Sequence, residues 1–277
     1  LVAQSTHKLL GSLTQTSMLH GQGSRIDVDR IQRLQQILMS TSPNYIFLAS
    51  LDMARHQWVT EGQSLMKDTL ELACTLRRAL NEIPGIASPS VEDIEGAFSL
   101  DETKIIIDAK NLGLTAQELE RELRARHIEV ELMKAYHVLL LITIGDTDTS
   151  IQQVIDAVQD ISDLYRHRIE SITNSIDFYA STVETLPTPI VALSPRQAFY
   201  TEMEEIPLPQ ALGRISGETI TYYPPGIPCL GVGETITEEV LAYMKQKQCD
   251  GYVPNGARDR QLQTILVCKD REIEVRY

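Results

Sequence analysis

Cysteine is scarce in this sequence, and its spacing argues against both a metal centre and a disulfide framework. The 277 residues include four cysteines: Cys74, Cys229, Cys249 and Cys268. No two of them have the C-x-x-C spacing of zinc sites, and no histidine cluster accompanies them. We therefore expect reduced thiols with structural roles and no metal.

Positive charge and long apolar runs are lacking as well. The chain has 25 Lys and Arg against 38 Asp and Glu, a formal net charge of -13. Nucleic acids and anionic membranes both require a basic surface, so we expect neither as a partner. No apolar run approaches the roughly 20 residues that span a bilayer, and no signal peptide is visible. We infer a cytoplasmic protein.

The apolar residues that are present predict two helices in the first third of the chain. Residues 26–40 carry isoleucine and leucine at helical spacing, and Asp27 or Asp29 is placed to cap them. Pro43 ends this pattern. A longer stripe then runs from Leu48 to Leu80, with Trp58 on it as an expected core residue.

The middle of the chain predicts a β-α-β-β-α unit. Its strands are residues 104–109, 128–132 and 138–144, and its first helix begins with the capping box of Thr115 and Glu118. Asp146 and Asp148 have a superficial calcium-loop spacing, but we interpret them as caps of the second helix. This order favours a compact sheet with helices on one side.

A polar helical connector over about residues 163–184 precedes a third unit. We expect this unit to contain a strand at 219–223, a tight turn at 224–228, a helix from a Thr235 cap to about Lys247, and a strand at 264–268. The chain thus divides into segments 1–82, 83–170, 171–190 and 191–277.

Lys8 is the first candidate for chemistry. A single lysine is usually a solvated surface residue. Here it follows Ser5, Thr6 and His7 at the end of an apolar, strand-like start. Partial desolvation at such a place lowers the cost of neutralising a lysine and prepares its amine for Schiff-base formation.

Other polar residues have simple structural interpretations. Ser40, Thr41 and Ser42 suit a helix-breaking turn before Pro43, and Glu234 suits the start of a helix. His20 ends a predicted strand, the tract 20–24 has too few glycines for a phosphate loop, and the glutamates between 202 and 205 suggest a solvated face.

Four segments carry a family resemblance. In order along the chain they are Ser5-Thr6-His7-Lys8, LTQTSMLH (13–20), TSPNYIFLASLDMAR (41–55) and YYPPGIPCLGVGE (222–234). Together they resemble the bacterial ornithine/lysine/arginine decarboxylases. The resemblance implies an α/β fold: the C-terminal part of a fold-type I (aspartate aminotransferase-like) large domain over 1–82, a small α/β domain over 83–170, a helical linker over 171–190, and the α+β decarboxylase C-terminal domain over 191–277.

The resemblance also implies roles for the candidate residues. Lys8 is the expected Schiff-base lysine for pyridoxal 5'-phosphate, with Ser5 and His7 at the cofactor phosphate and His7 also near the substrate. Ser40, Thr41 and Ser42, with Thr41 favoured, are expected to reach the cofactor phosphate of an identical subunit, which makes a composite site in a dimer. Glu234 is expected to face the distal cation of the substrate.

The activity so implied is decarboxylation of a basic amino acid to an amine in polyamine metabolism, with arginine ranked before lysine and ornithine. The family's other cofactor residues precede the lysine and have no counterpart here, so we expect an N-terminal chain or segment to complete the large domain. Two alternatives stay open: a non-catalytic interaction or regulatory subunit, and another fold-type I enzyme such as an aminotransferase or lyase.

Overall fold

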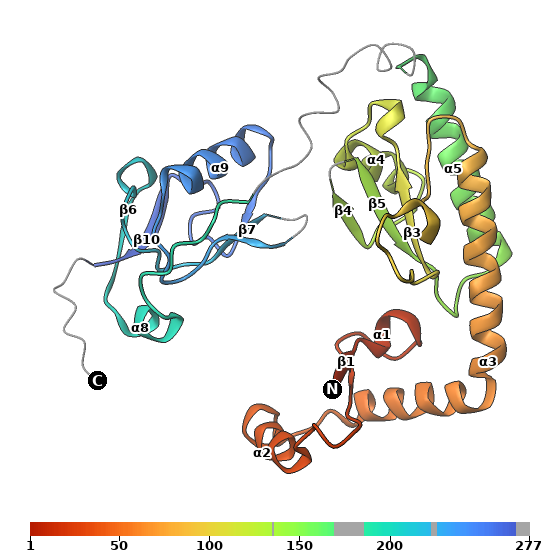
Figure 1. The fold of residues 1–277 in the computed structure, drawn as a ribbon, viewed down its shortest axis with the longest axis horizontal. Coiled ribbons are helices and arrows are strands. Elements are labelled where there is room, and N and C mark those ends of the chain that lie inside the picture. Colours follow the sequence, from red (N-terminus) through yellow and green to blue (C-terminus); the bar gives the residue numbers. More distant parts are fainter. Residues whose placement is uncertain (135, 169–185, 223–225, 270–277) are drawn as a thin grey trace. The chain divides into compact units, whose positions relative to one another are not determined.

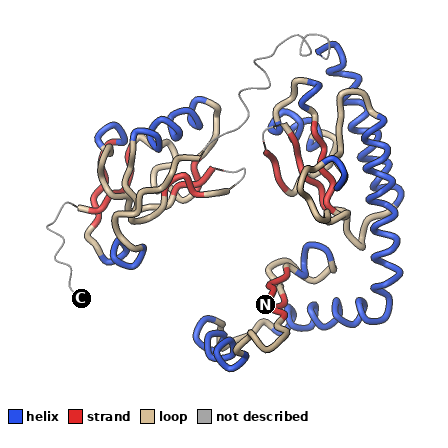
Figure 2. Tube along the Cα trace, viewed as in Figure 1, coloured by secondary structure: helices blue, strands red, loops and turns tan. Residues whose placement is uncertain are grey.

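The computed structural model describes residues 1–134, 136–168, 186–222 and 226–269. These residues belong to two compact units, Leu1–Ser175 (unit 1) and Ile176–Tyr277 (unit 2), and each unit is described by itself. Figure 1 traces the chain through its elements, and Figure 2 separates helices from strands.

Unit 1 begins with a small strand pair and several helices and continues into a three-stranded sheet. Its elements are β1 Val2–Gln4, α1 Thr6–Leu9, β2 Met18–His20, α2 Val28–Leu38, α3 Tyr45–Glu82, η1 Val91–Asp93, β3 Lys104–Asp108, η2 Lys110–Leu112, α4 Ala116–Arg124, β4 Leu132–Lys134, β5 His137–Leu141, α5 Asp148–Tyr165 and η3 Arg166–Arg168.

The sheet of unit 1 has the antiparallel order β3-β5-β4. Ile105 lies opposite Leu140 and Ile107 opposite Val138, and all four are buried. Directly opposed residues share a face of a sheet, so one face is buried. Leucines and isoleucines of α4, α5 and the second part of α3 belong to the same core. The predicted one-sided β-α-β-β-α unit is therefore confirmed.

Two of the predicted helix caps are confirmed, whereas the cap of α5 is Thr147, whose side chain accepts from Ser150 N, and not Asp146 or Asp148. The Asp27 side chain accepts from Arg30 N at 2.9 Å, and Thr115 and Glu118 form a complete capping box. Asp146 accepts from Thr143 N at 2.8 Å and from Ser150 Oγ at 3.1 Å, which is a structural role.

The strand predicted at 128–132 begins later, at Leu132. The end of α4 is the reason. His127 takes a positive φ of 63°, and Ile128 N donates to Leu123 O at 3.0 Å. This bond closes the helix in the manner of a Schellman motif, and the chain reaches β5 again at Glu131, whose N donates to Leu139 O just before β4 begins.

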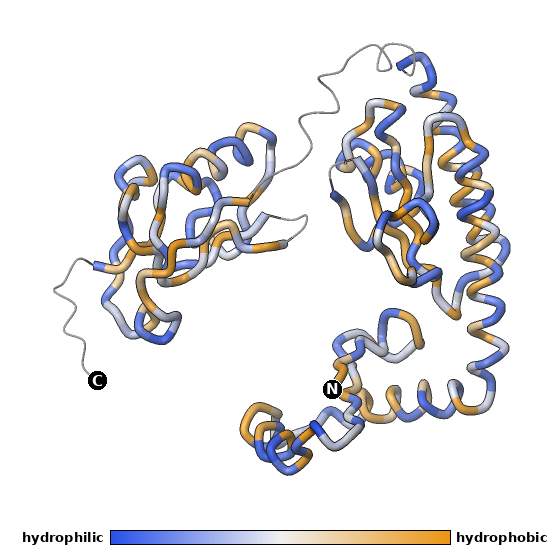
Figure 3. The backbone as a smooth tube through the Cα atoms, in the orientation of Figure 1, coloured by the Kyte–Doolittle hydropathy of each residue, from blue (hydrophilic) through white to orange (hydrophobic). Residues whose placement is uncertain are grey.

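The N-terminal part of unit 1 buries little. No residue of α2 is buried, and several apolar residues at the start of α3 are exposed. Figure 3 shows apolar residues along α2 and the first part of α3. The expectation that Trp58 lies in the core is wrong for this chain: it is 41% exposed, because the part of α3 that joins the core of unit 1 begins at Leu72.

Unit 2 contains a two-stranded sheet, β10-β6, and a three-stranded sheet, β8-β7-β9. Its elements are α8 Pro195–Tyr200, β6 Met203–Pro207, η4 Leu208–Gln210, β7 Ile220–Tyr222, β8 Pro228–Leu230, α9 Glu238–Cys249, β9 Pro254–Asn255 and β10 Thr264–Cys268. Their apolar residues form a core of their own.

The cap of α9 is Thr237, whose Oγ1 accepts from Val240 N at 3.2 Å, and the predicted Thr235 cap is wrong. Thr235 is held in an extended bridge with Ile215, and its N donates to Ile190 O at 2.8 Å. Of the predicted turn at 224–228, Pro224 and Pro225 lie outside the described residues, as does most of the connector and linker.

Among the described residues, no helix is both long and apolar enough to cross a membrane. The predicted border between residues 82 and 83 falls at the end of α3, inside unit 1. That border remains a prediction.

Candidate active site around Lys8

Lys8 lies on α1, a single helical turn that follows strand β1. Lys8 N donates to Ser5 O at 3.1 Å, and the buried Thr6 anchors the turn. Gly11, with φ of +76°, lets the chain leave the turn. The turn therefore fixes the backbone of Lys8 while its side chain extends outward.

His7 is held by the loop that follows α1. Its Nδ1 lies 2.7 Å from the carbonyl oxygen of Thr16. A carbonyl only accepts, so Nδ1 carries the proton and Nε2 is left for another partner. Thr16 is buried and bonds to Ser12 Oγ at 2.7 Å, which keeps this acceptor in place.

The ε-amine of Lys8 forms an ion pair with the side chain of Glu131. The two side chains are 45% and 34% exposed. The desolvation expected for Lys8 is therefore incomplete in this chain, because no described residue closes over the amine. An ion pair this open stabilises the fold by at most about 1 kcal/mol.

Ser5 occupies the N-cap position of α1 but makes no side-chain cap bond. Its hydroxyl is exposed, next to the turn that carries Lys8. Ser5, His7 and Lys8 are therefore brought together by one short segment.

The loop with Ser40, Thr41 and Ser42 connects α2 to α3 and is exposed. Ser42 N donates to Ser40 Oγ at 3.1 Å, which is the predicted turn chemistry. Within the described ranges, no hydrogen bond joins this loop to Ser5, His7 or Lys8. The expected role of Thr41 toward a neighbouring subunit is not tested by a single chain.

Glu234 lies in unit 2, so its position relative to Lys8 is not defined. Its Oε2 accepts from Gly231 N at 2.7 Å, and its backbone bridges Val191. The carboxylate thus folds back on its own loop and does not cap α9, whose cap is Thr237.

Burial raises the pKa of the nearby Cys229 thiol to about 11, with the Glu234 charge acting in the same direction.

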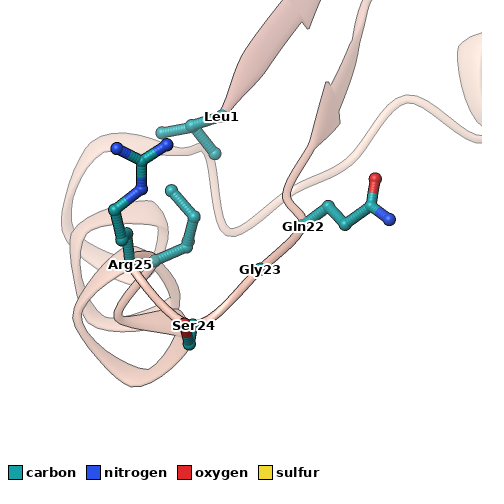
Figure 4. Close-up of a pocket in the computed structure, with 6 residues that line it drawn as sticks. Leu1, Gln22, Gly23, Ser24 and Arg25 are labelled. Atoms are coloured by element: carbon teal, nitrogen blue, oxygen red, sulfur yellow. The ribbon is translucent and has the colours of Figure 1, made fainter.

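The remaining candidates have structural roles. His20 is an exposed residue at the end of β2. The tract that follows it lines a shallow pocket in which Arg25 lies near Leu1 (Figure 4).

The glutamates between 202 and 205 are not simply a solvated face. Glu204 pairs with Arg214 at 2.6 Å, Glu202 with Lys269 at 3.3 Å, and Glu205 with Arg258 at 3.8 Å. In the part of the chain that is described, no group of three His, Cys, Asp or Glu side chains is arranged to hold a metal ion.

Sequence reasoning missed two residues of this site. Glu131 falls in the I-E-V-E-L stretch, whose alternation marks it only as polar. Thr16 belongs to the LTQTSMLH segment, but nothing in its spacing indicates that it accepts from His7. The contacts of Glu131 with Lys8 and of Thr16 with His7 depend on how the chain turns back on itself, which the spacing of apolar residues does not predict.

Comparison with known proteins places the chain in a family. Residues 1–150 match the profile described as Orn/Lys/Arg decarboxylase, major domain, and residues 178–252 match Orn/Lys/Arg decarboxylase, C-terminal domain.

Similar curated proteins include arginine decarboxylases of two bacilli. That of Bacillus anthracis is 40% identical over 273 residues, which cover 98% of this chain and 54% of that protein. That of Bacillus subtilis is 39% identical over 276 residues, covering 98% and 55%. The chain therefore spans about half the length of these relatives.

Solved structures of lysine decarboxylases share the fold. The Francisella novicida enzyme LdcF superposes with a TM-score of 0.77 at 23% identity, covering 96% of this chain and 48% of that one. The constitutive lysine decarboxylase of Escherichia coli gives 0.75 at 24%, covering 96% and 49%. These structures show the fold, and the family profile, which matches more than half of the chain, shows that this chain belongs to the Orn/Lys/Arg decarboxylase family.

Proposed function

We propose that the complete protein decarboxylates a basic amino acid with pyridoxal 5'-phosphate and yields an amine for polyamine metabolism. Arginine is the first candidate substrate, followed by lysine and ornithine. The arginine decarboxylases that are about 40% identical support this ranking. The observation that carries the proposal is Lys8 itself, with an exposed amine beside a fixed His7 in a chain of this family.

The residues around Lys8 suit the cofactor that this family generally uses. The Lys8 amine is accessible for bonding to an aldehyde, and the Ser5 hydroxyl and His7 Nε2 are available for phosphate oxygens. When bound, pyridoxal phosphate supplies an acceptor for the electrons left on Cα as carbon dioxide departs.

We assign separate tasks to the residues of this segment. Lys8 would hold the cofactor through its ε-amine, and the same amine would carry a proton to or from Cα of the substrate. His7 keeps one ring orientation because Thr16 O holds its Nδ1, so its Nε2 is presented consistently to phosphate or substrate.

Glu234 and the loop at 40–42 extend the proposed site. A carboxylate pairs well with an ammonium or guanidinium group, so Glu234 is proposed to select the distal cation. The bond from Gly231 N engages its Oε2, so Oε1 is the atom proposed to face the cation. Ser40, Thr41 and Ser42 are proposed to bind the cofactor phosphate of an identical subunit, and their exposure supports this role.

The exposed apolar residues of α2 and early α3 support a further partner. An amphipathic helix with no buried residue requires another surface to cover it. We propose that an N-terminal segment of the large domain supplies that surface. The proposed division is then 1–82 in the large domain, 83–170 in the small domain, 171–190 as linker and 191–277 as the C-terminal domain, in a cytoplasmic enzyme.

The test uses the full-length protein with arginine, lysine and ornithine supplied separately. We expect carbon dioxide and the matching amine from one of them. Lys8→Ala is expected to abolish this release. Glu234→Gln is expected to raise the KM for the preferred substrate more than the KM for an analogue that lacks the distal cation.

The other outcomes separate the alternatives. A keto acid in place of carbon dioxide indicates an aminotransferase. No turnover of any of the three amino acids, without cofactor absorbance, indicates an interaction or regulatory subunit.

A further inference from the structure

The Lys8–Glu131 ion pair joins two residues that are 123 positions apart in the chain. One lies on α1, and the other immediately precedes β4. A side chain added at Gly11, just after α1, would lie 4.0 Å from Ile144 Cδ1, just past β5. The segment that carries Lys8 therefore also lies close to the loop that follows β5.

The backbone of Glu131 is fixed by this sheet. Glu131 N donates to Leu139 O at 2.8 Å, and the next residue, Leu132, pairs with Leu139 in the ladder between β4 and β5. The carboxylate is consequently presented from a rigid edge, and only its side chain rotates to reach Lys8.

The neighbouring acid has a different partner. Glu129 is 73% exposed and pairs with Arg124 at 3.1 Å, the C-terminal residue of α4. Among the described residues, Glu131 has Lys8 as its ion-pair partner and Glu129 has Arg124. These two acids thus form a natural pair of test and control positions.

We propose that Glu131 is a positioning residue for Lys8. Its carboxylate holds the ε-ammonium at the edge of the small sheet while the site lacks its cofactor, and releases it when the site is loaded. The first half of this statement concerns the chain alone, and the second rests on the proposed function. An amine bonded to an aldehyde carbon keeps at most one of the three N–H donors that an ammonium offers to a carboxylate, so loading the site weakens the hold of Glu131 on Lys8.

The experiment measures the chemical reactivity of Lys8 in full-length, cofactor-free protein. Trace acetylation with acetic anhydride is quantified on the Lys8 peptide by mass spectrometry, with the Lys67 peptide as internal reference. Glu131→Gln is expected to raise Lys8 labelling roughly two- to fivefold, the range that an exposed ion pair implies. Glu129→Gln is expected to leave it unchanged, and Glu131→Asp is expected to restore part of the protection.

The same variants are then loaded with pyridoxal phosphate, and the absorbance of the bound cofactor is followed with time. Glu131→Gln is expected to load faster by a similar factor, because its amine has no carboxylate to leave. Equal Lys8 labelling in wild type, Glu131→Gln and Glu129→Gln overturns the positioning role. Cofactor that never attaches to Lys8, in protein whose Lys8 labelling still responds to Glu131, overturns the proposed function and leaves the resting ion pair standing.

Discussion

The two halves of α3 lie in opposite environments although they belong to one helix. Between Tyr45 and Val59 the apolar side chains are mostly exposed, and Leu48, for example, is 48% exposed. Between Thr69 and Leu80 the inward residues are buried, and Leu76 is fully enclosed. Both halves are apolar on one face, so sequence alone does not distinguish them.

The difference lies in what is available to cover each half. The second half packs against β3 and α5 within unit 1. The first half is covered only in part: Leu13 N donates to Ser50 Oγ at 3.3 Å and Ala54 is buried, but its larger apolar side chains join no core cluster of the described residues. The helix α2 has no buried residue. An apolar stripe on a helix thus indicates that another surface packs against it. It does not indicate whether that surface belongs to the same unit of the chain.

The sharpest test of this contrast replaces one leucine in each half. Leu76→Ala is expected to lower the free energy of unfolding of this chain by about 2–5 kcal/mol, because it leaves a cavity in a closed core. Leu48→Ala is expected to change it by no more than about 0.5 kcal/mol, because that side chain is largely in solvent already. Urea unfolding followed by circular dichroism measures both.

The same pair of variants in the full-length enzyme extends the test. If another segment covers the first half of α3, Leu48→Ala becomes costly there and approaches Leu76→Ala. Equal and small effects of Leu48→Ala in both proteins contradict the idea that this face is covered.

Unit 2 is expected to behave like the enclosed half of α3. Gly233 has φ of +88°, and a Cβ there would lie 2.3 Å from Leu193 O. Gly233→Ala is therefore expected to cost about 2–4 kcal/mol, from the backbone clash and the left-handed conformation. Gly213 is the control, with φ of +78° and no atom within 4 Å of the added Cβ; Gly213→Ala is expected to cost about 1–2 kcal/mol. Thermal unfolding of the two variants compares them, and equal losses argue against the clash.

The smallest expected effect concerns the pH dependence of the free energy of unfolding, to which the half-buried His137 contributes. Burial lowers the pKa of His137 below its usual 6.5, against the charge of Asp108 and together with that of Lys134. Below pH 6.5 the unfolded chain then binds more protons at this residue than the folded chain, so its contribution makes the folded state less stable as pH falls. We expect His137→Gln to flatten this part of the stability curve between pH 7 and 5.

Urea unfolding of the wild type and of His137→Gln between pH 7 and 5 measures this contribution. The same pH dependence in both proteins speaks against the burial argument.

Local patterns predicted most of the fold. The helices at 28–38 and 45–82, the capping box of Thr115 and the strand at 264–268 follow from periodicity and caps within a few residues of themselves. The strand near 128–132 begins later than predicted because a local bond, from Ile128 N to Leu123 O, closes α4 first. The Thr235 cap was wrong because a distant bond, from Thr235 N to Ile190 O, holds that residue extended.

The candidate site was predictable in a different measure. Ser5, His7 and Lys8 share one turn, so their proximity was contained in their spacing. The Glu131 partner of Lys8 was not, because no short-range rule links residues that are 123 positions apart. The prediction that Trp58 is buried was wrong for the same reason that Leu48 is exposed. The sequence of a helix does not show which other segment packs against it.

The central claim is that Lys8 carries the cofactor, and reduction followed by peptide mapping tests it most directly. The full-length protein is incubated with pyridoxal phosphate, reduced with borohydride and digested. The account predicts one stable phosphopyridoxyl mass addition, on the peptide that contains Lys8, which disappears in Lys8→Ala. A label on a different lysine, or on none while the wild-type protein is active, contradicts it.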